Sequence, residues 1–402
     1  MSEETMDTVE RIRRLAGEIE PEIIEARRRF HAYPERSTLE YETSAAICAA
    51  LDKMGIPYRC VCETGVVASI KGTAAAPEGE KPRCVALRAD IDALPVTEQT
   101  GAEYASKYEG VMHACGHDCH IAMLLGAARL VNEVRDAFAG EVRLLFQPAE
   151  ECSIGAKRMI AAGALDGVDN IYGAHIWSEL PAGMISCEPG QRMGHTDWFR
   201  IDVQGVSAHG SMPHKGVDAI VVAAELVNVL QILVSRDVSP FQPVVVTVGE
   251  FHGGEARNIM AGSAHLTGTV RTWSQRVRSE MPARMERIVE RAANALGAKA
   301  RLTYEEGNDG LANDPVCAER ARKSVVEMLG EEAVAFYDGT MSGEDFSEYL
   351  HLIPGVFVFV GCRNEDCGAV HPQHSCYFTV DESVLVKGAM VAARYAVRYL
   401  SE

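Results

Sequence analysis

The chain has 402 residues, and 57 acidic side chains against 39 lysines and arginines give it a formal net charge of −18. Apolar residues make up 47% of the sequence and charged residues 24%, which is the composition of an ordinary folded protein. The acidic balance argues against nucleic acids and anionic membranes as partners, because no basic stretch would gain from counterion release. We find no apolar run of the ~18 residues that a membrane helix needs and no apolar signal-peptide core at the N-terminus. We therefore expect a cytoplasmic protein.

Strands and helices alternate over the first half of the chain and again near its end. The expected helices are one ending near residue 30, then 41–54, 121–131 and 316–329; the expected strands are 66–71, 84–88, 141–146, 170–175 and 356–361. Polar residues follow several of the strand ends, as they do in an open, doubly wound α/β sheet. The first fold expectation is therefore an α/β domain built on such a sheet.

A different order of elements begins near residue 199. Strands are expected over 199–206, 243–249, 264–271 and 299–305, with helices over 218–234 and 279–296. This β-α-β-β-α-β order is the ferredoxin-like pattern. We expect a small α+β domain, 191–307, inserted into a first domain that is made of 1–190 and 308–402.

Three histidines and two cysteines lie close together within residues 112–120, MHACGHDCH. Cys115 and His117 are two positions apart, so in an extended segment both side chains point the same way. A thiolate and an imidazole on one face suit zinc or a later first-row metal rather than magnesium or calcium. Asp118 or Asp90 would hold the imidazole in one tautomer. The alternative is that the histidines are polar residues at a helix start and that Cys115 belongs to the core.

Carboxylates and further histidines follow other strands. Glu150 and Glu151 come shortly after the strand 141–146. Such a pair is usually a solvated turn, but beside a metal one carboxylate can bind the ion while the other takes a proton from water. His175 marks another strand end. Together the candidate ligands are five, Cys115, His117, Glu151, His175 and one of His371 and His374, a number that suits two ions about 3.5–4 Å apart.

Nine stretches in order along the chain carry a resemblance to a known family: FHAYPE, ALRADIDALP, MHACGHDCH, LFQPAEE, AHIWSELPAG, SAHGSMPH, GTVRTW, SGEDFS and HPQHSCYF. They are similar to the co-catalytic metallopeptidase family of aminoacylases, carboxypeptidases and deacylases. Within it, they resemble most the amidohydrolase branch of hippurate hydrolases, indole-acetyl-amino-acid hydrolases and N-acetyl-diaminopimelate deacetylases. The resemblance spans almost the full chain and implies an α/β catalytic domain with an inserted ferredoxin-like dimerisation domain.

The resemblance implies two divalent metal ions per subunit and a role for each matching ligand. The implied ligands are Cys115 as the bridge, His117 and His175 on one ion, and Glu151 and His374 on the other. His374 is preferred to His371 because the family's ligand lies four residues before the aromatic residue that matches Phe378. The metal itself stays open among Zn, Mn, Co and Ni. Cys119 departs from the family, which usually has a small residue there.

The same resemblance implies the catalytic and substrate-binding residues. Glu150 would be the general base, and His209 of the inserted domain would reach the active site of the partner protomer and polarise the scissile carbonyl. Asn258 and Arg271 would contact the substrate carboxylate. The implied protein is a homodimer that hydrolyses the amide bond of N-acyl amino acids. Two other interpretations stay open: a dipeptidase or aminopeptidase with the same metals, and a non-catalytic metal-binding dimer.

Overall fold

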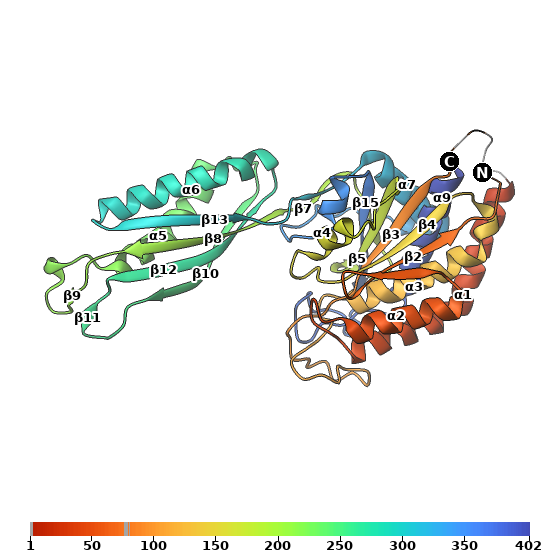
Figure 1. Ribbon diagram of the computed structural model, residues 1–402, viewed down its shortest axis with the longest axis horizontal. Coiled ribbons are helices and arrows are strands. Elements are labelled where there is room, and N and C mark those ends of the chain that lie inside the picture. The colour runs from red at the N-terminus through yellow and green to blue at the C-terminus, as the bar shows by residue number, and fades with distance from the viewer. Residues whose placement is uncertain (1–2, 76–78, 80) are drawn as a thin grey trace. The chain divides into compact units, whose positions relative to one another are not determined.

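A computed structural model describes residues 3–75, 79 and 81–402, and the chain divides into two compact units (Figure 1). The first unit comprises the residues up to Gly190 together with Ala312–Asp338 and Asp345–Glu402. The second comprises Gln191–Leu311 and Gly339–Glu344. The chain thus leaves the first unit and returns to it, crossing the boundaries within strands β7 (Gly190–Met193) and β14 (Leu311–Asn313).

The first unit is built on a seven-stranded sheet in the order β1-β2-β4-β3-β5-β15-β6. Its strands are β1 (Tyr58–Val61), β2 (Gly65–Lys71), β3 (Cys84–Asp90), β4 (Glu141–Gln147), β5 (Asn170–Pro181), β6 (Ile185–Ser186) and β15 (Gly355–Arg363). The four central strands, β4, β3, β5 and β15, are parallel, and the outer pairs are antiparallel. All seven residues of β3 are buried, because helices cover both faces of a parallel sheet. The mixed α/β class predicted from the sequence is confirmed.

Helices in the first unit surround this sheet. They are α1 (Glu3–Ala32), α2 (Tyr41–Met54), α3 (His117–Glu133), α4 (Gly155–Ala161), α7 (Pro315–Leu329), α8 (Ser347–Leu350) and α9 (Val384–Ser401), with short 3-10 turns at Arg135–Ala137 and Glu331–Ala333. Both α3 and α9 contact the central strands, and α1 packs on both of these helices. Gly126 of α3 allows α1 and α9 to approach α3 closely. A Cβ at this position would lie 2.7 Å from Cδ1 of Ile23 in α1 and 3.1 Å from Cβ of Ala389 in α9.

A buried polar cluster ties α1 to the start of α3. Asp118, in the first turn of α3, accepts a hydrogen bond from Nε of Arg27 and lies 2.8 Å from Nδ1 of His31. Nε2 of His31 lies 3.2 Å from Oε1 of Glu98, and Arg27 also reaches Glu382 just before α9. These contacts hold the first turn of α3 in place, and that turn carries His117.

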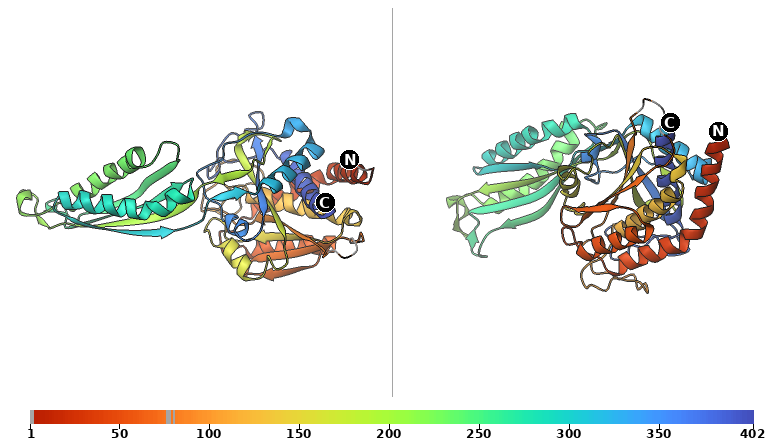
Figure 2. Two further views of the ribbon diagram at one scale, coloured as in Figure 1. Left: turned by 90° about the horizontal axis from the view of Figure 1, so that it is seen from above. Right: turned by 45° about the vertical axis from the view of Figure 1, so that its right-hand side comes forward.

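The second unit has its own sheet and its own core. The strands are β8 (His195–Gln204), β10 (Val244–Gly253), β12 (Ser263–Thr272) and β13 (Lys299–Glu306), antiparallel in the order β10-β12-β8-β13. Helices α5 (Ala219–Ile232) and α6 (Gln275–Ala295) lie on one side of this sheet (Figure 2). Short strands β9 (Ala208–His209) and β11 (Ile259–Met260) pair with each other, and Pro213–Lys215 forms a 3-10 turn.

The segment Ala219–Asp237 is the one helical segment, in the part of the chain that is described, with the length and composition of a membrane span. It consists of α5 and a π-helical turn, Leu233–Asp237. In the second unit it contacts strands β8, β10 and β12, and Val222, Leu226 and Leu230 are buried in the core of that unit. Its apolar composition is therefore explained in part by packing within the second unit.

The second unit includes Gly339–Glu344, which the sequence analysis assigned to the first domain. The reason lies in backbone hydrogen bonds. The amide of Gly194 donates to the carbonyl oxygens of Thr340 and Ser342, and the amide of Thr340 donates to Arg192. A stretch that is distant in sequence thus pairs with the start of the second unit.

We predict that Glu98→Gln lowers stability most at mildly acidic pH. Burial opposes ionisation, but the hydrogen bond from His31 keeps the pKa of Glu98 at about 2, below the ordinary value of about 4.3. Burial and Arg27 oppose protonation of His31, yet the charge of Asp118 and the hydrogen bonds of both carboxylates raise its pKa. As the pH falls from about 4 toward 2, Glu98 becomes protonated and its contribution to the free energy of unfolding is lost. As the pH rises through the raised pKa of His31, above about 6.5, the imidazole loses its proton and its contribution to the free energy of unfolding is lost.

Urea unfolding of both proteins across this pH range tests the prediction. The difference in the free energy of unfolding is expected to reach about 1.5–3 kcal/mol between about pH 4.5 and 6.5, and to shrink on either side. A difference that stays constant from about pH 3 to 9 would contradict the ion pair.

Candidate functional site

Neighbouring parallel strands bring the candidate residues to one edge of the first sheet. Asp90 ends β3, Glu150 and Glu151 follow β4, and β5 carries His175. The last residue pair between β3 and β5 is Arg88 with Gly173. His175 therefore lies on β5 two residues beyond this last pair. The carboxyl edge of an open parallel sheet is the usual place for a ligand site.

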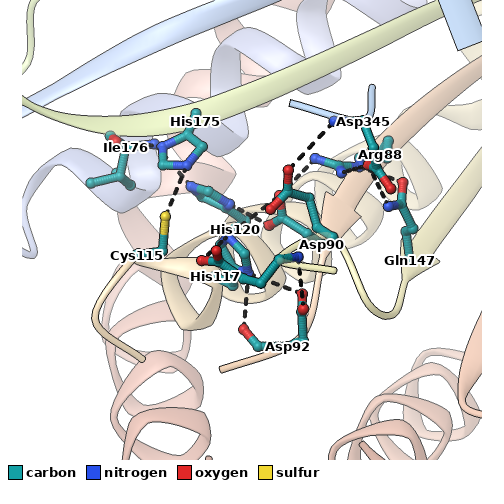
Figure 3. Close-up of polar contacts among 12 residues, drawn as sticks. Arg88, Asp90, Asp92, Cys115, His117, His120, Gln147, His175, Ile176 and Asp345 are labelled. Atoms are coloured by element: carbon teal, nitrogen blue, oxygen red, sulfur yellow. Dashed lines mark hydrogen bonds and ion pairs between the residues drawn. The ribbon is translucent and has the colours of Figure 1, made fainter. Parts of the chain in front are cut away.

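The donor atoms of five predicted ligands lie close together. Sγ of Cys115 is 3.4 Å from Nε2 of His175, and Figure 3 shows the sulfur pointing at that ring. Oε1 of Glu151 lies 3.9 Å from Nε2 of His117 and 3.6 Å from Nε2 of His374. The atoms form two groups, Cys115 with His117 and His175, and Cys115 with Glu151 and His374. Cys115 is common to both.

Asp92 is the residue that orients His117, and sequence reasoning missed it. Nδ1 of His117 lies 2.9 Å from the carbonyl oxygen of Asp92 and 3.2 Å from its Oδ1 (Figure 3). The other carboxylate oxygen, Oδ2, accepts the amide of Glu151 at 3.0 Å and the hydroxyl of Ser37 at 2.7 Å. One buried carboxylate therefore aims one predicted ligand and holds the backbone of a second, which is how outer residues tune metal sites.

The expectation that Asp118 or Asp90 orients the His117 ring was wrong. Asp118 bonds to Arg27 and His31, as described above. Asp90 accepts from His120 at 2.5 Å, and Nε2 of His120 accepts the amide of Ile176 at 2.9 Å. Both ring nitrogens of His120 are therefore engaged within the protein.

His117 begins α3 rather than lying in an extended segment. The N-cap residue is Gly116, at φ +95°, a conformation that favours glycine. His117 and Cys115 therefore converge through this turn and not through strand alternation. His120 and Asp118 share the first helical turn but point to different partners.

The remaining two predicted histidine ligands are each oriented by one backbone contact. Nδ1 of His175 donates to the carbonyl oxygen of Ile176 at 2.6 Å, which leaves Nε2 facing Cys115. His374 has a φ of +66°, and its amide donates to the carbonyl oxygen of Ala114 at 2.7 Å. The ring of His371, by contrast, packs against Tyr377 with 5.4 Å between ring centroids.

These residues fit divalent metal ions. Nε2 of His117 and Oε1 of Glu151 are buried atoms with no hydrogen-bond partner. Burial, with the charges of Glu151 and Glu150, raises the pKa of Cys115 well above its ordinary value, and burial raises the pKa of Glu151 to about 7. A thiolate, imidazoles and a carboxylate form a donor set for zinc and later first-row metals, and a cation would favour the ionised thiol and carboxyl.

The pKa of His117 is raised as well, but here by nearby negative charge and against the effect of burial. Burial lowers it, but the charge of Asp90 and the hydrogen bond to Asp92 more than offset burial and raise it to about 10. A proton on Nε2 thus balances negative charge at the place where a metal ligand would need a lone pair. A metal ion would take over that role, because an ion also stabilises the surrounding carboxylates.

Glu150 lies next to this cluster without belonging to either group that contains Cys115. It is 9% exposed, and its Oε1 is 3.4 Å from the amide nitrogen of Asp345. Together with His117 and Glu151 it forms a further set of close ligand atoms. A carboxylate in this position is able to exchange a proton with a molecule held at the cluster.

The other three predicted residues belong to the second unit. His209 is exposed and pairs in register with Ile259, next to Asn258, whose carbonyl oxygen accepts the amide of Gly210. Arg271 lies on β12, and its buried Nη1 has no hydrogen-bond partner. Burial lowers the pKa of Arg271. A partly buried guanidinium with a spare donor is suited to bind a carboxylate.

Comparison with known proteins gives one family and several relatives. The model of peptidase family M20/M25/M40 matches residues 86–398. The thermostable carboxypeptidase 1 of Saccharolobus solfataricus is 40% identical over 98% of this chain and 99% of its own length. The N-acetyl-L-cysteine deacetylase of Bacillus subtilis is 39% identical over 95% of this chain and 89% of its own.

A solved structure extends the likeness to three dimensions. The YxeP protein of Bacillus subtilis, described as a dinuclear metal-binding peptidase, superposes with a TM-score of 0.83. It is 33% identical, and the match covers 96% of this chain and 99% of that one.

We predict that Asp92→Ala weakens metal binding, because it removes the carboxylate that contacts His117 and holds the Glu151 amide, and leaves only the backbone carbonyl oxygen of residue 92 as an acceptor for His117. The affinity for Co²⁺ or Zn²⁺, measured by competition with a chelating dye, is expected to fall about 10–100-fold. Asp52→Ala, an exposed aspartate of α2, serves as the control and should bind as the unchanged protein does. Equal affinities in all three proteins would mean that Asp92 does not support the site.

Proposed function

The chain belongs to peptidase family M20/M25/M40, and on this premise we propose how it works. It is a metal-dependent amidohydrolase that cleaves the amide bond of N-acyl amino acids to a carboxylic acid and a free amino acid. The observation that carries the proposal is the convergence of Glu151 and three histidines on Cys115, with Glu150 beside them. The residue roles that follow are our proposal.

Two divalent ions would bind per subunit. His117 and His175 would hold one ion, Glu151 and His374 would hold the other, and Cys115 would be a ligand in both groups; the two groups of close donor atoms support this division. Zn, Mn, Co and Ni all accept this donor set. The bound ions supply the Lewis acidity that polarises the amide carbonyl and acidifies water.

Glu150 acts as general base and then as general acid. Its carboxylate takes the proton from the attacking water and afterwards gives it to the leaving nitrogen. Two observations support this role: Glu150 is nearly buried, and the amide of Asp345 lies near its Oε1. Its chain neighbour Glu151 binds metal, so adjacent carboxylates have separate tasks.

His209 donates a hydrogen bond to the carbonyl oxygen as negative charge develops there. Nδ1 of His209 accepts the amide of Ser211 at 3.1 Å. The proton of the neutral ring is therefore on Nε2, which makes Nε2 a hydrogen-bond donor. Such a donor, aimed at an oxyanion, is the kind of group that lowers the barrier of acyl transfer.

We propose that His209 acts in the active site of a partner subunit, in a homodimer formed through the inserted domain, residues 191–307. Two features of the second unit support a dimer formed through this domain. Val221 and Ile232 on α5 are 58% and 51% exposed, and β10 is an edge strand of its sheet. Exposed apolar helix faces and open sheet edges are surfaces that a second copy can cover.

Asn258 and Arg271 bind the carboxylate of the amino-acid part of the substrate. The unpaired Nη1 of Arg271 supports this role, because a substrate carboxylate would satisfy it.

A second candidate function follows from the same guanidinium group of Arg271. A peptide also ends in a carboxylate, and the relative named a carboxypeptidase keeps peptides among the substrates to be tested.

We also propose a cytoplasmic location. The twelve cysteines are all free thiols in the structure. Free thiols in this number are typical of a reducing compartment.

We predict metal-dependent release of free amino acid from N-acyl amino acids. The assay uses N-acetyl, N-benzoyl and N-succinyl amino acids and free dipeptides, with Mn²⁺, Zn²⁺ or Co²⁺ and a chelated control. Release from the acyl panel that chelation abolishes is the expected result. Cleavage of dipeptides alone would favour a peptidase, and silence on both panels with metal bound would favour a non-catalytic protein.

Glu150→Gln is the internal control of this assay. It should keep its metal and lose about 10²–10⁴ in kcat, the usual contribution of general acid–base catalysis. Glu63→Gln, an exposed glutamate, should retain full turnover. Near-normal turnover by Glu150→Gln would refute the role of Glu150.

We predict that two inactive variants complement each other. Homodimers of His209→Ala and of Glu150→Gln each lack one group in every site. A mixed dimer has one site with both groups if His209 is supplied by the partner, so mixing is expected to recover part of the activity. No recovery despite subunit exchange, followed with differently tagged chains, would contradict sharing between subunits.

A further inference from the structure

The turn that delivers Glu150 and Glu151 contains an unusual backbone conformation. Ala149, immediately before them, has a φ of +56° and is fully buried. A residue with a Cβ is disfavoured in this left-handed region. Something in the structure must therefore hold the Ala149 peptide in place.

The carbonyl oxygen of Ala149 accepts the amides of Ile154 and Gly155 within the same turn, and its own amide is held by a carboxylate from a distant part of the chain. Glu40 is fully buried, and its Oε1 accepts the amide of Ala149 at 3.0 Å and that of Thr38 at 2.8 Å. Its Oε2 accepts the hydroxyl of Thr64 at 2.7 Å. Three chain segments thus meet on one side chain, whose hydrogen bonds go to Thr38, Thr64 and Ala149 and not to the predicted metal ligands.

Glu40 does not serve the helix that it precedes. It occupies the N-cap position of α2, yet its side chain makes no cap hydrogen bond. Burial raises the pKa of Glu40, and no ion pair joins it to a basic group among the described residues. The surrounding groups therefore interact with Glu40 through hydrogen bonds that its two carboxylate oxygens accept, and not through an ion pair.

We propose that Glu40 is a positioning residue for the catalytic and metal-binding carboxylates. It acts through the backbone of Ala149: by holding this amide, it sets the direction in which Glu150 and Glu151 leave the turn after β4. The proposal rests on the proposed functions of those two glutamates. It adds to the site a residue that precedes them by more than a hundred positions in the sequence.

Substitutions at Glu40 separate positioning from general packing. Glu40→Met keeps the volume but leaves the Ala149 amide without an acceptor. Glu40→Gln keeps an oxygen for both amides and turns its NH₂ toward the Thr64 hydroxyl, which is able to accept. Thr64→Val is the matched control, because it removes a bond to the same carboxylate without touching Ala149. Glu40→Asp, whose carboxylate is withdrawn by one methylene, replaces Glu40→Met if that variant does not fold.

The first readout is Co²⁺ binding, which does not depend on turnover. Glu40→Met is expected to bind one of two Co²⁺ ions about 10–100-fold more weakly, which is the usual loss when a residue that holds a metal ligand in place is replaced. Glu40→Gln and Thr64→Val are expected to bind both ions as the unchanged protein does. The second readout is kinetic: kcat should fall at least about 10-fold with KM nearly unchanged. Ala149→Gly in the Glu40→Met background should restore both, since glycine adopts this φ without strain.

The outcomes separate this proposal from the proposed function. Co²⁺ affinities for Glu40→Met equal to those of the unchanged protein overturn the role of Glu40, whatever the activity. Equal losses in Glu40→Met and Thr64→Val, with no rescue by Ala149→Gly, also overturn it, since they indicate packing alone. An unchanged protein that binds two Co²⁺ ions but cleaves no amide refutes the proposed function, while a loss of Co²⁺ affinity in Glu40→Met still supports Glu40.

Discussion

The structure depends on how it keeps negative charge buried at one edge of its central sheet. Asp90 and Asp92 are fully buried there, with Cys115 and Glu151 beside them, and a buried charge is costly unless it is paired. Arg88, also buried, lies 2.6 Å from Asp90 and meets part of this cost. Burial nevertheless raises the pKa of Glu151 to about 7 and leaves its Oε1 without a hydrogen bond. Divalent cations at these atoms would balance the remaining charge, and this supports the proposal that the cluster is a metal centre.

The same requirement explains the residues around the ligands. A metal site needs its donors held in one geometry, and here backbone contacts achieve this as much as side chains do. Asp92 joins the ring of His117 to the amide of Glu151, and the amide of His374 is held by Ala114. In our account Glu40 adds the same kind of support to the turn before Glu150.

The sequence predicted what depends on residue type and local pattern. The helix over 41–54 is α2, and Gly55 ends it at φ +64° as a glycine should. The start of α3 was placed several residues late, because Gly116 caps it instead of a serine, threonine, asparagine or aspartate. Asp92 was missed in favour of Asp90 and Asp118, since spacing along a strand or helix does not reveal which carboxylate meets a ring from another element. The link from Glu40 to Ala149 is a contact of this tertiary kind, with no local signal.

The most direct test of the central claim is a crystal structure of the protein soaked with Mn²⁺ or Zn²⁺, with anomalous diffraction measured at the absorption edge of the metal. The account predicts two anomalous peaks about 3.5–4 Å apart. One should lie within bonding distance of His117 and His175, the other near Glu151 and His374, with the sulfur of Cys115 between them. A single peak, or metal bound through Asp90 and His120 instead, would contradict the account.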